Sequence, residues 1–171
     1  MIKYIHGGDI YSLAEQGIKE EDILDFSANI NPLGMPEKVR KAAVKALEQC
    51  CCYPDPLCRN LRQAVAEKEQ VPEEFLIFGN GAADLIFRLA AAVKPKKALV
   101  PIPSFAEYEE ALTAVGCRTE HFYLQEDKDF VVDDTFCRVL TEEVQMIFLC
   151  NPNNPTGQLI QPELLKKILQ C

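Results

Sequence analysis

The sequence lacks a long hydrophobic run, a Lys- or Arg-rich block and a signal-like apolar core near its first residues. Its apolar runs are far too short to span a membrane, so we expect no membrane association. Without a basic block, nucleic acid is not an expected partner. The formal net charge of -8 and the pI near 4.8 are expected to serve solubility. Because no signal peptide is recognisable, we expect a cytoplasmic location.

The chain also lacks a Cys-x-x-Cys pair and a Cys/His pair at zinc spacing, although it contains 8 cysteines. Reduced thiols are the expectation for a protein without a secretory signal. A metal site through Cys50–Cys58 is the alternative, but no metal is predicted. Cys150 lies on a buried-strand pattern and is expected to be a small apolar filler.

Short apolar strands alternate with helical patterns along most of the chain. A composition with 48% hydrophobic and 26% charged residues is typical of a soluble globular protein. The alternation predicts an α/β fold with a mainly parallel sheet flanked by helices. The expected strands are 75–78, 98–102, 118–124 and 145–150. The expected helices in this part follow Gly81 and Ser104, cover 133–140 and run from Pro162 to Cys171.

The first third of the chain is expected to be mixed helix and loop. A short helix over 11–16 is followed by an extended piece over 23–27 and a loop over 29–36. Pro36 is expected to open a helix. Asp55 and Pro56 are expected to be the N-cap and first residue of another helix.

Unusual residues follow three of the predicted strands, at the edge where α/β proteins bind ligands. In Gly79-Asn80-Gly81-Ala82-Ala83-Asp84, two glycines open a helix whose first amides have no internal partner, which suits a phosphate. The segment is neither a Walker loop nor a Gly-x-Gly-x-x-Gly dinucleotide motif. A plain strand-to-helix turn, with Asp84 supporting the helix start, is the alternative.

Phe105 lies just past the next strand, where an aromatic ring can stack on a planar cofactor or belong to the core. Tyr108 falls on the apolar face of the following helix. The segment Cys150-Asn151-Pro152-Asn153-Asn154-Pro155-Thr156-Gly157 then leaves a buried strand with stiff prolines and three asparagines. Such a loop can hold a side-chain amide in a fixed place.

The order of these segments resembles the fold-type I pyridoxal phosphate (PLP) enzymes, and Tyr53-Pro54-Asp55-Pro56 is similar to their Tyr-Pro segment. The resemblance implies PLP as the cofactor. It implies that Gly81, Ala82 and Ala83 hold the phosphate, that Phe105 stacks on the pyridine ring and that Asn154 bonds the ring oxygen. Tyr53 would reach the phosphate bound by the partner subunit, which implies a homodimer. Relatives often carry Glu or Thr where this chain has Ala82-Ala83-Asp84.

Within that family, the chain resembles the threonine-phosphate decarboxylases of cobalamin biosynthesis. The similar segments are His6-Gly7-Gly8-Asp9, Asp25 to Gly34, Gly79-Asn80-Gly81 and Phe105-Ala106-Glu107-Tyr108. The resemblance implies a small phosphorylated amino-acid substrate near His6, Gly8 and Asn29. His6 also fits a solvated terminal histidine. The alternatives are histidinol-phosphate or a related aminotransferase, and a non-catalytic module that binds a phosphate ligand or a partner.

The same resemblance divides the chain into an N-terminal segment over 1–50 and an incomplete PLP-binding large domain over 51–171. The N-terminal segment would supply part of the small domain and the substrate loop. The Schiff-base lysine is expected beyond Cys171, so that this chain alone contains no catalytic residue. Lys94, Lys96 and Lys97 are expected on a solvent-facing turn.

Overall fold

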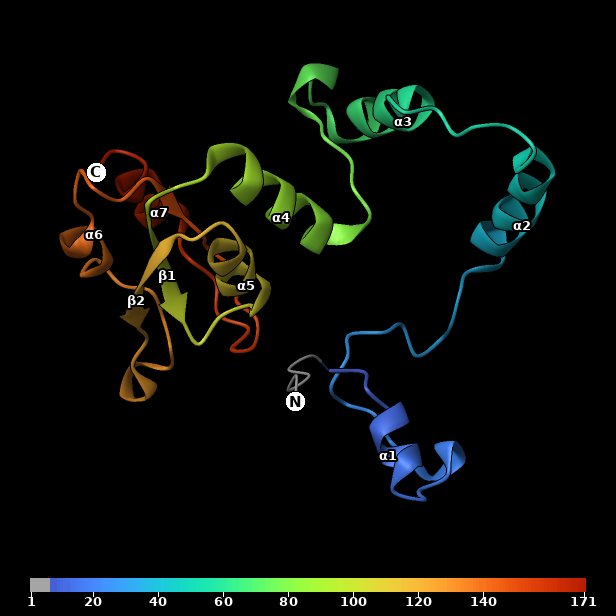
Figure 1. Cartoon of the computed structure of the whole chain (residues 1–171), viewed down its shortest axis with the longest axis horizontal. Coiled ribbons are helices and arrows are strands. Elements are labelled where there is room, and N and C mark those ends of the chain that lie inside the picture. The colour runs from blue at the N-terminus through green and yellow to red at the C-terminus, as the bar shows by residue number, and fades with distance from the viewer. Residues whose placement is uncertain (1–6) are drawn as a thin grey trace. The chain divides into compact units, whose positions relative to one another are not determined.

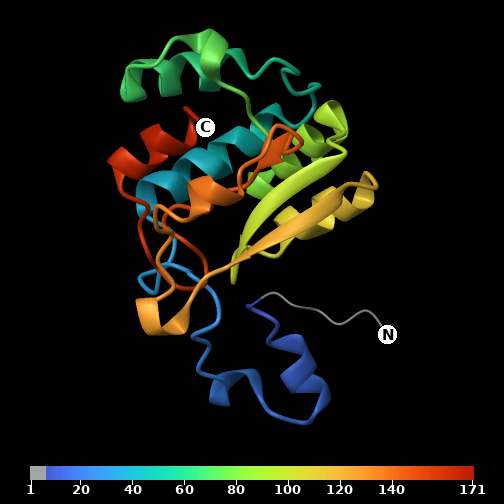
Figure 2. The same ribbon diagram turned by 90° about the vertical axis from the view of Figure 1, so that its left-hand side faces the viewer.

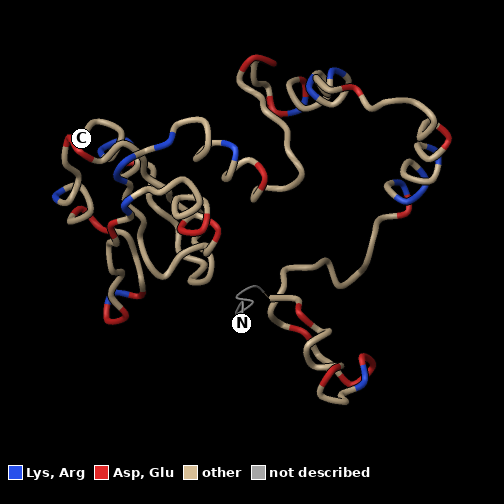
Figure 3. Tube along the Cα trace, in the orientation of Figure 1, with Lys and Arg blue, Asp and Glu red and all other residues tan. Residues whose placement is uncertain are grey.

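The structure, a computed structural model, describes residues 7–171. Its internal contacts divide the chain into two units, one that extends to Phe78 and one formed by Gly79–Cys171. No helix in the described part of the chain is long and apolar enough to cross a membrane. Lysines and arginines are interspersed with acidic residues along the chain (Figure 3).

The first unit consists of short helices joined by loops (Figure 1). Its helices are α1 (Tyr11–Glu15), α2 (Glu37–Ala46) and α3 (Arg59–Glu69), with 3-10 turns at Glu20–Asp22, Leu47–Gln49 and Glu73–Phe75. The predicted helix over 11–16 is therefore confirmed to within one residue, and Pro36 directly precedes α2. None of residues 7–78 is buried.

The helix predicted to start at Pro56, with Asp55 as its N-cap, begins three residues later, at Arg59. The Asp55 carboxylate accepts hydrogen bonds from the amides of Leu57 (3.1 Å) and Arg59 (2.8 Å), which closes a turn instead of a helix. Cys58 then has a φ of 49°, in the left-handed region, so that the turn cannot continue directly into α3.

The prediction of a strand over 75–78 is wrong. Phe75 ends a 3-10 turn, and Leu76 is extended but pairs with no strand in the described chain. The guanidinium of Arg62 donates to the carbonyl oxygens of Glu73 and Leu76. It thereby satisfies carbonyl groups that a neighbouring strand would otherwise pair with.

The second unit contains a parallel three-stranded sheet in the order β2-β1-β3. Its strands are β1 (Lys97–Ile102), β2 (Arg118–Tyr123) and β3 (Met146–Ile147). Lys97 pairs with Arg118 at the start of β1 and β2, and Ala98 pairs with Met146 of β3. β1 and β2 lie side by side in both views (Figures 1 and 2). The predicted parallel sheet is therefore confirmed.

Helices cover both faces of this sheet. They are α4 (Gly81–Val93), α5 (Glu107–Ala114), α6 (Phe136–Val139) and α7 (Pro162–Ile168). Leu99 of β1 packs with Phe136, Leu164 and Ile168 of α6 and α7. Its neighbours Ala98 and Val100 pack on the other face with Leu112 of α5 and with Ile86 of α4. Side chains of a strand alternate between faces, so one apolar strand supplies two cores.

Three elements are clearly shorter than the sequence predicts. The helix expected from Pro162 to Cys171 is only α7, which ends at Ile168. The helix expected over 133–140 is only α6, because the Asp133 carboxylate accepts bonds from the amide and hydroxyl of Thr135 and closes a turn first. The strand expected over 145–150 is only β3. Beyond Ile147, the amide of Phe148 still donates to the carbonyl of Leu99 at 3.3 Å, and the chain then turns into the asparagine loop.

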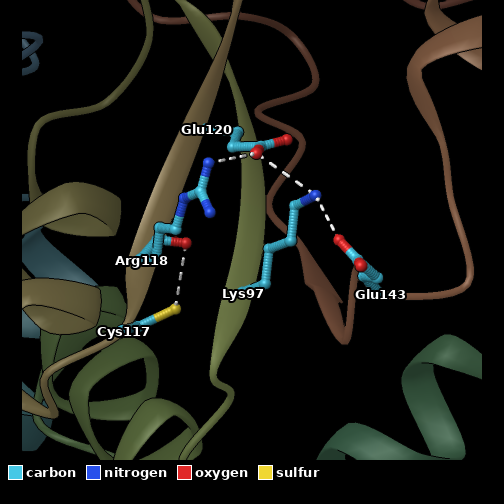
Figure 4. Close-up of polar contacts among 5 residues, drawn as sticks. All are labelled: Lys97, Cys117, Arg118, Glu120 and Glu143. Carbon is cyan, nitrogen blue, oxygen red and sulfur yellow. Dashed lines mark hydrogen bonds and ion pairs between the residues drawn. The ribbon is translucent and has the colours of Figure 1, made fainter.

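Ionic contacts hold the amino-terminal edge of the sheet together (Figure 4). The Lys97 ammonium lies 3.2 Å from a carboxylate oxygen of Glu120 on β2 and 3.1 Å from one of Glu143, which precedes β3. These contacts, that with Glu143 first, raise the pKa of Lys97 above its ordinary value. The expectation that Lys97 faces solvent is wrong, since its side chain is 15% exposed and lies within the sheet.

Candidate functional site

Two connections leave strands at the carboxyl edge of the sheet, opposite Lys97. They are the loop between β1 and α5 and the asparagine loop after β3, which spans Cys150–Gly157. The third candidate connection, the turn that opens α4, follows no strand in the described chain. α4 ends only three residues before β1 begins, so its first turn points away from the start of that strand and toward the carboxyl edge. All three connections belong to the second unit.

The turn before α4 depends on its glycines. Gly81 has a φ of +82°, which a residue with a side chain rarely adopts, and a Cβ built on Gly81 would meet nothing within 4 Å. A Cβ on Gly79 would lie 2.6 Å from Asp84 Oδ2 and 2.7 Å from the Leu85 side chain. Glycine at position 79 therefore lets the Asp84 carboxylate reach back to the turn.

Asp84 has the supporting role expected for it. Its carboxylate accepts a hydrogen bond from the Asn80 amide at 2.9 Å, and the guanidinium of Arg88 lies 3.6 Å from the same oxygen atom. Arg88 partly offsets the negative charge of Asp84 at the start of the helix. The amides of Ala82 and Ala83 belong to the first turn, where no helical carbonyl is available to them.

Aromatic rings line the connection between β1 and α5. Phe105 is half-buried and meets Tyr108 edge to face, with the ring centroids 5.6 Å apart. Tyr108 in turn stacks on Phe148, with centroids 4.7 Å apart and planes 5° apart. Burial, and then a hydrogen bond with Cys150, raise the pKa of Tyr108 to about 12, so its hydroxyl is neutral at physiological pH.

Cys150 is more than the apolar filler that its strand pattern predicted. Its thiol sulfur accepts a hydrogen bond from the Asn154 amide and donates to the Pro152 carbonyl, each at 3.3 Å. The thiol thus fills the inside of the asparagine loop and stabilises its bend. The side chain of Asn154 is exposed, as a ligand-contacting amide must be.

Asn153 joins the asparagine loop to the loop that carries Phe105. Its side-chain nitrogen Nδ2 donates to the Pro103 carbonyl at 3.0 Å and to the Thr156 hydroxyl at 2.8 Å. Its oxygen Oδ1 accepts from the Ser104 hydroxyl at 3.2 Å. Two of the predicted cofactor-binding residues, Phe105 and Asn154, are thereby brought to one junction.

These groups fit PLP. The helix start offers unpaired backbone amides next to open space for a phosphate, and Phe105 offers an aromatic face for a planar ring. The exposed amide of Asn154 is a neutral donor for a ring oxygen. In the described part of the chain, no cluster of three or more His, Cys, Asp or Glu side chains is arranged to hold a metal ion.

The remaining predicted residues lie in the first unit, except for His6, which is outside the described residues. Tyr53 is fully exposed, and Asn29 is exposed in the loop that follows Ser27. Gly8 has a φ of +84°, and its amide donates to the Ser27 hydroxyl at 2.8 Å. Gly8 and the loop that carries Asn29 are therefore in contact through Ser27. The expected division of the chain at residue 50 stays a prediction.

Sequence reasoning missed Asn153, Ser104 and Ser27 as structural partners of the predicted site residues. Asn153 is only 8% exposed, although a proline-rich loop with three asparagines suggests an exposed segment. The sequence does contain a sign of such a partner. Asparagine occurs at 151, 153 and 154, whereas a single asparagine is enough to contact the cofactor ring.

Comparison with known proteins places these features in a family. Residues 21–171 match the family described as aminotransferase class I and II. The threonine-phosphate decarboxylase of Salmonella typhimurium is 42% identical over 164 residues, which are 95% of this chain and 45% of that protein. Histidinol-phosphate aminotransferase 1 of Cupriavidus pinatubonensis is 34% identical over 170 residues, 97% of this chain and 44% of that protein.

Among solved structures, the chain is similar to the L-threonine-O-3-phosphate decarboxylase from Porphyromonas gingivalis. The TM-score is 0.68 at 28% sequence identity, with 80% of this chain and 42% of that chain covered. The fold is that of the fold-type I PLP enzymes, represented by part of its sheet and flanking helices. The chain spans about half the length of the relatives it matches.

The glycine turn, the aromatic residue after β1 and the asparagine loop after β3 occur in a fold-type I sheet, and the family match covers most of the sequence. The cofactor of this family is pyridoxal 5′-phosphate. The chain belongs to the class I and II aminotransferase family of PLP-dependent enzymes.

Proposed function

We propose that the complete protein catalyses the PLP-dependent decarboxylation of L-threonine O-3-phosphate to (R)-1-amino-2-propanol phosphate, in the cytoplasm and as a step of cobalamin biosynthesis. The main support is the identity of 42% with a threonine-phosphate decarboxylase, against 34% with a histidinol-phosphate aminotransferase over a similar length. The contact between the segments around Gly8 and Ser27 agrees with this proposal, because both segments carry the decarboxylase-like sequence.

In this proposal, the second unit binds the cofactor. The amides of Ala82 and Ala83, together with Gly81, hold the phosphate at the positive end of α4. Phe105 lies against one face of the pyridine ring and excludes water from it. The Asn154 side chain donates a hydrogen bond to the ring oxygen. When bound, PLP supplies an electron sink for the bond that breaks at the substrate Cα.

The first unit contributes to the substrate and to the dimer in the same proposal. His6, Gly8 and Asn29 contact the phosphate or the carboxylate of the substrate. In a homodimer, Tyr53 reaches the phosphate bound to the other protomer, and its fully exposed ring is compatible with a contact outside its own chain.

We propose that the lysine that binds PLP lies outside these 171 residues, so that this chain alone is inactive. Lys97 is the lysine held within the sheet. It lies at the amino edge of β1 and is paired with Glu120 and Glu143, which keeps it charged and away from the carboxyl edge. A charged ammonium has no lone pair with which to attack a carbonyl.

The proposal is tested with the complete protein, PLP and L-threonine O-3-phosphate. Release of carbon dioxide and formation of 1-amino-2-propanol phosphate in equal amounts are expected. Unphosphorylated L-threonine serves as the matched substrate control and should react far more slowly, since the phosphate contacts are lost. Absence of carbon dioxide release would overturn the proposal.

The second candidate is histidinol-phosphate aminotransferase or a related transaminase. It is favoured by the shared asparagine loop and by the 34% identity with such an enzyme over 97% of this chain. It predicts transfer of the amino group from histidinol phosphate to 2-oxoglutarate with formation of glutamate. Glutamate formation without carbon dioxide release would replace the first proposal by the second.

A further inference from the structure

Among the residues that the structure describes, Asn153 is the one polar residue that is buried. It is 8% exposed and lies inside a loop. An amide withdrawn from water is costly unless its hydrogen-bonding groups find partners. For Asn153, each of these groups has a partner. Its backbone amide donates to the backbone carbonyl of Gln158 at 2.8 Å, and its backbone carbonyl accepts from the backbone amide of Gly157 at 2.6 Å.

Both polar atoms of the side chain have partners as well. Nδ2 donates its two hydrogens to the Pro103 carbonyl and the Thr156 hydroxyl, while Oδ1 accepts from Ser104. The carbonyl of Pro103 can only accept, which fixes the orientation of the amide. Both side-chain polar atoms of Asn153 are therefore engaged inside the protein and the residue is buried, so its effect on the cofactor passes through its neighbours.

Those neighbours are the two groups proposed to contact the pyridine ring. Pro103 and Ser104 directly precede Phe105, and Asn154 directly follows Asn153. Asn153 is thus hydrogen-bonded to residues far away in the sequence. The separation is 49 residues for Ser104 and 50 residues for Pro103. A planar cofactor has its ring face and its ring oxygen in fixed relative positions, so the groups that contact them must keep a fixed spacing.

We propose that Asn153 is a positioning residue that sets the spacing between Phe105 and Asn154 and thereby lets both contact one cofactor ring. This inference rests on the proposed function as far as PLP binding is concerned. It does not depend on whether the complete protein decarboxylates or transaminates its substrate.

A double-mutant cycle in the complete protein tests this coupling. The dissociation constant of PLP is measured by absorbance titration for the wild type, N153A, N154A and the double variant. N153A is expected to weaken binding about tenfold in the wild-type background and much less when Asn154 is already Ala. The absorption maximum of bound PLP should shift in N153A in the same direction as in N154A.

Asn151 provides the matched control. Its Oδ1 accepts from the backbone amide of Ile160 at 2.9 Å, a bond to the segment just after the asparagine loop that does not reach the segment of Phe105. N151A is expected to lower the melting temperature without coupling to N154A in PLP affinity. The proposal would be overturned if N153A weakened PLP binding by the same factor in the wild type and in N154A, and if N151A did the same. Asn153 would then have only a structural role.

If N153A fails to fold, S104A carries the test, since it removes only the donor to Oδ1 and leaves Asn153 in place. S104A is expected to weaken PLP binding by a smaller factor and to couple to N154A in the same direction. An unchanged PLP affinity in S104A would then overturn the proposal. Failure of the wild-type protein to bind PLP at all would instead refute the proposed function.

Discussion

The backbone amide of Gly8 donates to the hydroxyl of Ser27 at 2.8 Å, and that hydroxyl donates in turn to Asp25 Oδ1 at 2.5 Å. The hydrogen bond from Ser27 holds the pKa of Asp25 below its ordinary value, so the carboxylate remains a charged acceptor. Two segments that the sequence analysis assigned to the substrate by resemblance are therefore held together by a short polar chain.

Replacement of Gly7 by alanine should disturb this contact. A Cβ at position 7 would lie 1.8 Å from the Ser27 carbonyl oxygen, so the two segments must separate. We expect the KM for the phosphorylated substrate to rise on the order of tenfold or more, with the spectrum of bound PLP unchanged. Steady-state kinetics and absorbance measure the two effects. G17A is the control, since a Cβ at Gly17 meets nothing within 4 Å, and an equal rise of KM in G17A would contradict the prediction.

Gly81 and Gly116 form a matched pair for testing the phosphate site. Both have positive φ, +82° and +71°, and a Cβ on either would meet nothing within 4 Å. Alanine should therefore cost each of them a similar amount of stability, about 1 kcal/mol. Only G81A should also weaken PLP binding, because it alters the first turn of α4. Thermal melting and PLP titration measure the two quantities, and equal PLP affinities in G81A and G116A would remove Gly81 from the site.

Replacement of Asn154 by alanine should perturb the cofactor directly. Loss of a hydrogen bond to a charged acceptor costs about 1.5–3 kcal/mol, which corresponds to a turnover slowed roughly 10- to 100-fold. The absorption spectrum of bound PLP should change at the same time. L159A, an exposed position just after the loop, is the control. An unchanged spectrum and rate in N154A would show that Asn154 does not contact the cofactor.

Asp133 should make the stability of the protein depend on pH. Bonds from the Thr135 hydroxyl and then from Lys128, at 2.9 Å, lower the pKa of Asp133 to about 2 from an ordinary 3.8. A lowered pKa in the folded state stabilises the protein above pH 3.8, and this contribution disappears as the pH falls through about 2. The full shift corresponds to roughly 2 kcal/mol, which solvent screening at this partly exposed carboxylate reduces to about 1 kcal/mol.

The variant D133N should therefore be less stable than the wild type by about 1 kcal/mol at pH 6, and the two should converge toward pH 2. Urea unfolding across this range measures the difference. D134N removes a neighbouring surface ion pair with Lys167, at 2.8 Å, and is expected to have a smaller effect. If the difference in the free energy of unfolding between D133N and the wild type stayed constant down to pH 2, the lowered pKa of Asp133 would not be its cause.

Much of the second unit is predictable from the sequence. The apolar runs of β1 and α4 are found to within one or two residues, and β1 is buried along most of its length, which leaves few other ways to arrange such a run. β2 is found to within one residue although it is a more polar and less buried strand. The Phe105 loop and the asparagine loop follow from the same pattern, since a strand end with Asn and Pro is conspicuous. The glycine turn was found from its glycines alone, because the strand predicted before it is not formed.

The errors arise where a single side chain determines the local backbone. Asp55 and Asp133 each close a turn that delays a helix, and Arg62 satisfies carbonyls that a strand at Leu76 would have used. Lys97 and Asn153 are polar residues with little exposure, each enclosed by partners far away in sequence. Side-chain periodicity contains no information on such partners, because it describes only neighbours along the chain.

The absence of any buried residue among residues 7–78 has a thermodynamic consequence. Ordering this unit costs conformational entropy that its own contacts, without a core, do not offset. In the proposed homodimer the partner subunit would supply the surface that stabilises this unit, and such stabilisation follows mass action. Protease cleavage within residues 7–78 should accordingly slow as the concentration of the complete protein rises, whereas cleavage of the second unit should not.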